Sequence, residues 1–198
     1  MCLPDSGQGA LRVSVVNRTE VEGMGKHQSD LDFRLMAFYY KLRDLFSPPG
    51  RLLAEVQITE GCRVLDYGCG PGSSVFGAAR EVGETGKVYA LDIHPMAIEN
   101  IKAIASRRRL TSVQAIQSDC ETGLADRSVD IILLFDTFHH LDNSEAVLYE
   151  LHRVLRPDGI LSFSDHHMRE DEILNSMTDK GLFRLAGRAR RTYTFRRV

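Results

Sequence analysis

The chain of 198 residues has no tryptophan, only four cysteines, no long apolar run and no marked excess of charge of either sign. Its formal net charge of −2 gives it no general attraction to nucleic acid or to anionic membrane surfaces. No segment approaches the ~20 consecutive apolar residues of a membrane-spanning helix. The N-terminal region carries Asp5 and no continuous apolar stretch, which argues against a secretory signal. We therefore expect a cytoplasmic protein without a membrane span.

The four cysteines, Cys2, Cys62, Cys69 and Cys120, lack the short paired spacings of a metal site. In the absence of a secretory signal, we expect them to be reduced thiols. What the chain does have is enough apolar residues for a core, 43% of the total, and a length typical of one domain. We expect no metal centre.

The most informative segment starts with a short apolar strand that ends in Asp66 and continues into three alternating glycines, Gly68, Gly70 and Gly72. Glycines at that spacing let the backbone turn tightly and let a ligand approach the main chain. The dinucleotide fingerprint G-x-G-x-x-G/A fits imperfectly, because its sixth position is Ser73, and no G-K-[ST] follows that would make a phosphate loop. The pattern that does fit is D-x-G-x-G-x-G.

Three regions of the chain differ in their patterning. Residues 1–28 are polar with little periodicity, which predicts a flexible tail. Residues 29–50 open with Ser29 as a potential helix cap and carry apolar residues at helical spacing up to position 46, after which Pro-Pro-Gly ends the helix. This helix is expected to act as an N-terminal lid. Residues 51–198 are expected to form the main domain.

From residue 51 the pattern alternates between helices and strands. A helix through Ile58 opens the domain, and five strands with three intervening helices follow. This alternation predicts right-handed βαβ units in an α/β, Rossmann-like, doubly wound and mostly parallel sheet. Two strands at 182–188 and 191–198 predict an antiparallel C-terminal edge hairpin. The earlier strands are expected at Arg63–Asp66, Val88–Ile93, Val113–Gln117, Val129–Phe135 and Ile160–Ser164, and the helices at Ser74–Val82, Pro95–Ser106 and Ser144–Leu155, the last stopped by Pro157-Asp-Gly159.

Acidic residues follow the next two predicted strands. Asp92 closes the second strand, where a carboxylate can accept hydrogen bonds from both hydroxyls of a ribose. It could equally cap the helix that starts at Pro95. Asp119 follows the third strand and could accept from the exocyclic amine of an adenine, or be a solvated loop carboxylate.

The fourth strand leads into Phe135-Asp-Thr-Phe-His139-His140-Leu141, and the fifth is preceded by Leu-Arg-Pro-Asp-Gly159. Together with D-x-G-x-G-x-G, these segments resemble the class I S-adenosylmethionine-dependent methyltransferases, in particular the small-molecule branch close to ubiquinone and menaquinone biosynthesis (methyltransferase type 11). The resemblance covers residues 51–165 well and the flanking segments loosely. It implies S-adenosylmethionine as the cofactor and methyl transfer as the reaction.

The resemblance also implies roles for individual residues. Asp66 and the backbone from Tyr67 to Gly72, with its three glycines, would hold the methionine moiety of the cofactor. Asp92 would hold the ribose and Ile93 would lie against the adenine, with Asp119 and Cys120 at the edge of the base. Phe135 and Asp136 would lie beside the methyl group.

A general base is needed only where the acceptor must lose a proton. His139 and His140 are the candidates for this catalytic role, because histidine titrates near neutral pH. They could also be a pair at a helix start with one ring buried and hydrogen-bonded. His166 and His167 follow the fifth strand at the same edge of the sheet, but adjacent histidines on a strand end point apart and no third ligand spacing appears, which disfavours a metal.

The favoured acceptor is a small, partly apolar molecule, since the aromatic cluster Phe38–Tyr40 could line an apolar pocket and the N-P-P-[YF] pattern of amino-methylating nucleic-acid enzymes is absent. The alternative is an RNA or protein acceptor bound through the basic C-terminal hairpin, whose residues 180–198 carry seven Lys and Arg and no acid. Nucleic acid is the less favoured partner. Either a monomer or a homodimer is compatible with the sequence.

Overall fold

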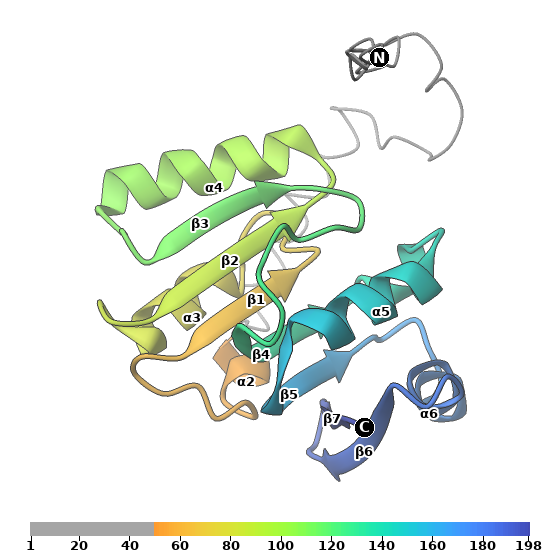
Figure 1. Cartoon of the computed structure of the whole chain (residues 1–198). Coiled ribbons are helices and arrows are strands. Elements are labelled where there is room, and N and C mark those ends of the chain that lie inside the picture. Colours follow the sequence, from red (N-terminus) through yellow and green to blue (C-terminus); the bar gives the residue numbers. More distant parts are fainter. Residues whose placement is uncertain (1–49) are drawn as a thin grey trace, which may run out of the picture.

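The computed structural model describes residues 50–198 (Figure 1). The predicted flexible tail at 1–28 and nearly all of the predicted lid segment at 29–50 lie outside the described residues. Both therefore stay predictions.

One mixed sheet organises the described chain, with strand order β3-β2-β1-β4-β5-β7-β6. The first five strands are parallel, and β7 is antiparallel to both of its neighbours. The predicted α/β, mostly parallel sheet with an antiparallel C-terminal hairpin at its edge is confirmed. The strands are β1 (Arg63–Tyr67), β2 (Lys87–Asp92), β3 (Val113–Gln117), β4 (Val129–Phe135), β5 (Leu155–Ser164), β6 (Phe183–Arg188) and β7 (Tyr193–Arg197).

Helices cover both faces of this sheet. In Figure 1, α5 lies in front of the strands and α3 behind them. The central strand β4 explains why both faces are covered: Ile132 and Leu134 pack into the core beneath α5, whereas Ile131 and Leu133 pack into the core beneath α3. A strand buried on both faces reads as a continuous apolar run. The helices are α2 (Gly50–Leu53), α3 (Val75–Val82), α4 (Pro95–Arg108), the 3-10 helix η1 (Phe138–His140), α5 (Ser144–Val154) and α6 (Glu170–Thr178).

One predicted helix end and one predicted strand start are wrong. Helix α2 stops at Leu53 rather than Ile58, because the backbone closes through short bonds such as Val56 N–H to the Leu53 carbonyl and turns Val56 into the core. Helix α5 stops at Val154, and β5 begins at once, five residues earlier than Ile160. A register shift between β4 and β5 accommodates the Pro-Asp-Gly segment within the strand, where a Cβ on Gly159 would meet the Asp130 carbonyl oxygen.

Helix α6 is an addition to the predicted pattern. Its first turn is closed by Glu172, whose Oε2 accepts from Arg169 N at 2.8 Å, and Ile173 and Met177 bury one face against the sheet. The same spacing of an acid three residues after the cap, followed by apolar residues four apart, is visible in the sequence. Within residues 50–198, no helix is both long enough and apolar enough to cross a membrane.

The turn of the β6–β7 hairpin lies at the edge of the sheet where the parallel strands end. Tyr193, the first residue of β7, pairs with Phe163 near the end of β5. Glu55 secures the turn from the other side, since its Oε2 accepts hydrogen bonds from Arg191 N and from the backbone and side chain of Thr192. A single carboxylate thus joins residues more than 130 positions apart in the sequence.

Candidate cofactor and acceptor site

The predicted site residues gather at the carboxyl ends of the parallel strands. The chain runs outward from β1 through β2 to β3, then returns to β4 on the other side of β1. Ligands of open α/β sheets bind in the crevice at such a switch point. Motif residues 66–72 leave β1 there, with Asp92 ending β2 beside them and Phe135 ending β4.

The three motif glycines all have positive φ, of 75° at Gly68, 49° at Gly70 and 90° at Gly72. A Cβ at Gly68 would collide with the Thr137 side chain, and one at Gly72 would collide with Ile101 and Phe76. A Cβ at Gly70 would meet nothing within 4 Å. Two of the glycines therefore allow close packing of the protein itself, and Gly70 borders open space.

Asp66 is buried at the root of this turn, with a relative exposure of 3%. Its Oδ2 is buried and has no hydrogen-bond partner among the described residues. Burial raises the pKa of Asp66 to about 7, and the nearby Asp92 carboxylate adds to the effect. An unsatisfied buried carboxyl oxygen is costly, and this one marks the place of a missing donor.

Asp92 links the glycine turn to the end of β2. Its Oδ2 accepts from Gly70 N at 2.8 Å and its Oδ1 accepts from His94 N at 2.8 Å. Burial raises the pKa of Asp92, while these backbone donors oppose the rise. The helix-capping alternative falls to a different side chain, because His94 Nδ1 accepts from Met96 N at the start of α4.

The residues around the predicted adenine position differ in exposure. Ile93 is 53% exposed, an unusual state for a large apolar side chain next to a buried strand. Tyr67 is instead buried, and its hydroxyl donates to the Asp119 carbonyl at 3.1 Å. From its buried position at the end of β1, Tyr67 therefore holds the segment that contains Asp119 and Cys120. Asp119 is exposed and Cys120 is half-buried.

At the end of β4, the side chain of Thr137 lies over the glycine turn, where its hydroxyl donates to the carbonyls of Phe135 and Gly68. Phe135 is half-buried and packs toward the core beneath α3. Asp136 has φ 50°, a left-handed conformation uncommon for a non-glycine residue. Backbone strain of this kind concentrates at functional sites.

Four histidines lie in a row beyond Asp136. The ring centroids are separated by 3.9 Å between His140 and His139, 4.3 Å between His139 and His167, and 3.9 Å between His167 and His166. The first two come from the segment after β4 and the last two from the segment after β5. The fold therefore brings together both predicted bases and the second histidine pair.

Two carboxylates hold this row. Asp165, whose side chain is fully buried, accepts from His139 Nδ1 at 2.7 Å. Asp136 accepts from His166 Nδ1 at 2.7 Å. Each bond joins the two segments. The aspartate after β4 (Asp136) binds a histidine after β5 (His166), and the aspartate after β5 (Asp165) binds a histidine after β4 (His139). The part of the chain that the structure describes contains no group of three or more potential ligands arranged for a metal ion.

A family model described as a methyltransferase domain matches residues 58–187, which include every site element described above. The chain belongs to this family. The predicted resemblance to the class I S-adenosylmethionine-dependent methyltransferases is confirmed, and the family and fold imply S-adenosylmethionine as the cofactor.

Similar proteins agree with this assignment. The chain is 33% identical to an aklanonic acid methyltransferase of Streptomyces sp. (strain C5), over 61% of this chain and 56% of that protein. It is 30% identical to a carboxy-S-adenosyl-L-methionine synthase of Vibrio atlanticus (strain LGP32), over 64% of this chain and 53% of that protein. It therefore spans about half the length of these curated relatives.

A solved structure extends the likeness to three dimensions. The methyltransferase domain superposes on a SAM-dependent methyltransferase from Aquifex aeolicus with a TM-score of 0.66 and 27% identity. The match covers 74% of this chain and 86% of the Aquifex chain.

The residues of this methyltransferase domain fit its cofactor. The unpartnered Asp66 oxygen is suited to an ammonium donor, and a Cβ at Gly70 would enter the open space above the turn. Thr137 and Asp165 were not predicted as site residues, whereas Asp136 was expected beside the methyl group. Thr137 and Asp165 carry no sequence signal of their own, because only the fold places them over Gly68 and against His139.

Proposed function

We propose that this domain transfers the methyl group of S-adenosylmethionine to a small acceptor bound over the ends of β4 and β5. The observation that carries the proposal is the unpartnered buried oxygen of Asp66, which lies at the root of the open space bordered by Gly70. Among the described residues, no side chain or backbone group donates a hydrogen bond to this oxygen. A ligand with a cationic amine would supply the missing donor.

The bound cofactor supplies a methyl group already activated on a sulfonium, so the protein mainly orients the reactants and excludes water. In the proposed site, ionised Asp66 pairs with the cofactor amine and Asp92 accepts from the ribose. The Asp92 carboxylate already receives Gly70 N and His94 N, and its remaining lone pairs are available. Exposed Ile93 covers the adenine.

The remaining predicted residues have separate roles in this arrangement. Tyr67 holds the segment of Asp119 and Cys120 in place through the Asp119 carbonyl. Phe135 forms the wall between the glycine turn and the acceptor. His139 and His140, beyond it, are the available proton acceptors for an acceptor that must be deprotonated.

Relatives support a small acceptor. The aklanonic acid methyltransferase is named for an organic acid, and the carboxy-S-adenosyl-L-methionine synthase for a small product. Neither name refers to nucleic acid or protein, and the alternative of an RNA or protein acceptor is not favoured. The cytoplasmic location and the monomeric or homodimeric state stay predictions.

Calorimetric titration with S-adenosylmethionine and S-adenosylhomocysteine tests the first half of the proposal. We expect micromolar binding, about −8 kcal/mol. Asp92→Ala should weaken it by about 1–3 kcal/mol, because charge-assisted hydrogen bonds are lost. Absence of binding to either compound, with NAD bound instead, would contradict the proposal.

A screen with tritiated S-adenosylmethionine tests the second half. The purified full chain is incubated with a fractionated cell extract, and the label is followed into the small-molecule, RNA and protein fractions. We expect it in the small-molecule fraction and expect Asp66→Asn to abolish it. Label confined to RNA or protein would establish the alternative acceptor class.

A further inference from the structure

The row of histidines is held by two crossed His–Asp bonds that differ in burial. The side chain of Asp165 is 0% exposed and that of its partner His139 is 18% exposed. In the second pair, Asp136 is 15% exposed and His166 is 61% exposed. Asp165 is also tied down by the backbone, since it accepts from His139 N and His167 N. Only the first pair therefore combines a rigid, dry carboxylate with a ring that solvent or ligand can still reach.

The bond to Asp165 determines the tautomer of His139. A carboxylate accepts, so Nδ1 of His139 carries the proton and Nε2 presents its lone pair. Burial of the carboxylate stabilises the imidazolium once Nε2 takes a proton, because charges interact more strongly away from water. This is the arrangement of a general base with a positioning carboxylate.

The neighbouring rings favour one base over the other. The groups that the structure places against His139 are Asp165 from the end of β5, His140 beside it and His167 from the opposite segment. Burial lowers the pKa of His140, and the charge of His139 lowers it further. When one ring of a pair about 4 Å apart is protonated, its neighbour resists protonation. The proton is therefore best received at His139, where a carboxylate stabilises it.

We propose that His139, positioned by Asp165, is the general base and that the acceptor is a hydroxyl compound of the phenol or enol class. This deepens the proposed function and rests on it. A carboxylate or thiolate acceptor is already ionised or ionises easily, and would need no such dyad. A phenol or enol is largely protonated at neutral pH and does need one.

The step balances with groups already named. The acceptor oxygen uses a lone pair to form a bond to the methyl carbon, and the S–CH3 bond breaks with its electron pair staying on sulfur. The hydroxyl proton passes to Nε2 of His139. The products are the methyl ether, S-adenosylhomocysteine and a His139 imidazolium, which Asp165 stabilises until the proton leaves to solvent.

Nuclear magnetic resonance of the imidazole nitrogens in the full chain tests the dyad without any acceptor. We expect His139 to hold its proton on Nδ1. In Asp165→Asn the share of the tautomer protonated on Nδ1 should fall, because the carboxylate that accepts this proton is lost. Asp136→Asn is the matched variant and should alter only His166. A His139 tautomer unchanged by Asp165→Asn would overturn the positioning role.

A series of substituted phenols with tritiated S-adenosylmethionine tests the acceptor class, with parent compounds of pKa up to about 10. We expect the wild type to methylate the series and His139→Ala to lose about 100-fold or more on the least acidic members. The loss should shrink toward the acidic members, which ionise unaided. Equal losses across the series would overturn the base role. No methylation of any phenol, with cofactor binding and label transfer to an extract molecule intact, would overturn the acceptor class and leave the proposed function standing.

Discussion

Gly68, Gly70 and Gly72 share a left-handed backbone but differ in what surrounds them. At the first and third positions a side chain would strike Thr137 or Ile101, so the glycine requirement arises from the protein's own packing. At Gly70 the space is open, and we expect the bound cofactor to add to the requirement that the positive φ imposes. The sequence pattern alone treats the three positions as equivalent. The structure separates their roles, and substitutions can test that separation.

Gly70→Ala should reduce S-adenosylhomocysteine affinity at least tenfold, about 1.4 kcal/mol, because its Cβ would occupy the cofactor space. Gly181→Ala is the matched control, since Gly181 also has positive φ and open surroundings but precedes β6, away from the cofactor turn. Both variants should lose similar stability from backbone strain. Calorimetry then separates the two, and equal affinity in both variants would contradict the ligand contact.

Asp66 should couple cofactor binding to pH. Its pKa is raised to about 7, so below pH 7 it is largely protonated in the free protein. A cationic cofactor binds the ionised form, so affinity should rise as pH increases from 6 to 8 and level off above, with proton release on binding. Titrations in buffers of different ionisation enthalpy measure the released protons. Asp66→Asn should remove the pH dependence, and a flat wild-type profile would refute the coupling.

The same carboxyl group should affect folding stability with the opposite pH dependence: stability falls as pH rises, whereas cofactor affinity increases. Because its pKa is higher in the folded than in the unfolded chain, Asp66 contributes most below the unfolded value of about 4, and that contribution declines as pH rises to about 7. Asp66→Asn should therefore raise the free energy of unfolding at pH 8 while impairing binding. Urea unfolding at pH 5 and pH 8 measures this difference.

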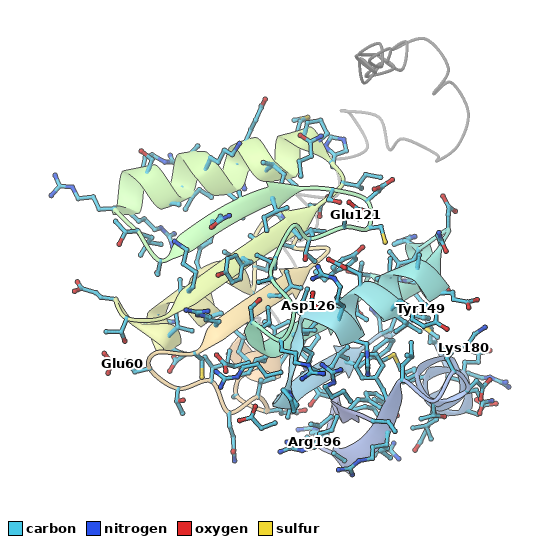
Figure 2. All side chains as sticks on the ribbon, in the orientation of Figure 1. Glu60, Glu121, Asp126, Tyr149, Lys180 and Arg196 are labelled. Carbon is cyan, nitrogen blue, oxygen red and sulfur yellow. The ribbon has the colours of Figure 1, made fainter. Side chains whose placement is uncertain are left out.

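At the scale of elements, one helix holds the loop that carries the adenine-side residues. Glu150 of α5 accepts from both the backbone N and the hydroxyl of Thr122, and Arg153 joins Glu150 to Asp126 and to the Leu124 carbonyl. Figure 2 labels Asp126 in this loop, beside α5. The loop therefore follows α5 rigidly, although its own sequence predicts only a polar connection.

Glu150→Gln should destabilise the protein by about 1–3 kcal/mol at pH 7, because a charged hydrogen-bond partner is lost. Its hydrogen bond to Arg153 is the main cause that lowers the pKa of Glu150 to about 2. The contribution is therefore present above the unfolded value of about 4.3 and is lost as pH falls toward 2. Urea unfolding at pH 7 and pH 3 should show the difference between the two proteins narrowing.

The matched control for this network is Glu145→Gln. Glu145 is 54% exposed and pairs with Lys180 at the surface, where an ion pair contributes little. We expect a change within about 0.5 kcal/mol at both pH values. A loss as large as that of Glu150→Gln would show that burial of the network is not what makes it stabilising.

At the scale of the whole molecule, the turn of the antiparallel hairpin lies toward the carboxyl end of β5, whereas Arg196 and Arg197 lie beside the start of β5. Figure 2 shows Arg196 of the hairpin well apart from Glu121, which follows the adenine-side residues. Several of its arginines have internal partners: Arg188 pairs with Glu170, and Arg196 and Arg197 donate to the carbonyls of Asp158 and Leu155. These bonds attach the hairpin to β5 and α6.

Arg184→Glu with Arg190→Glu should therefore change methyl transfer to a small acceptor by less than about threefold, an effect under 1 kcal/mol. Raising salt from 50 to 200 mM should likewise have little effect. An acceptor bound through 6–10 phosphate contacts would lose about 10³–10⁵ in affinity over that range. Initial rates of label transfer provide the measurement, and a steep salt dependence abolished by the double reversal would identify the hairpin as a nucleic-acid platform.

The sequence by itself determined the fold class and the edge of the sheet at which the predicted cofactor residues gather. Local signals were sufficient there: apolar strands, glycines that need positive φ, and acids placed at strand ends converge on one edge of any parallel sheet. Asp66, Gly70 and Asp92 follow from that argument. Helix α6 had a usable capping signal, whereas the early start of β5 depended on the pairing of Leu155 with Val129, which no local window contains.

Only the tertiary structure decided the acceptor side. His139 and His140 are equivalent in sequence, and they differ because Asp165, 26 positions later, reaches one ring and not the other among the described residues. Asp136 and His166 are likewise joined only by the pairing of β4 with β5. The periodicity of a segment predicts which element it forms. Which side chains meet across two elements depends on register, strain and burial, and these exist only once the sheet is assembled.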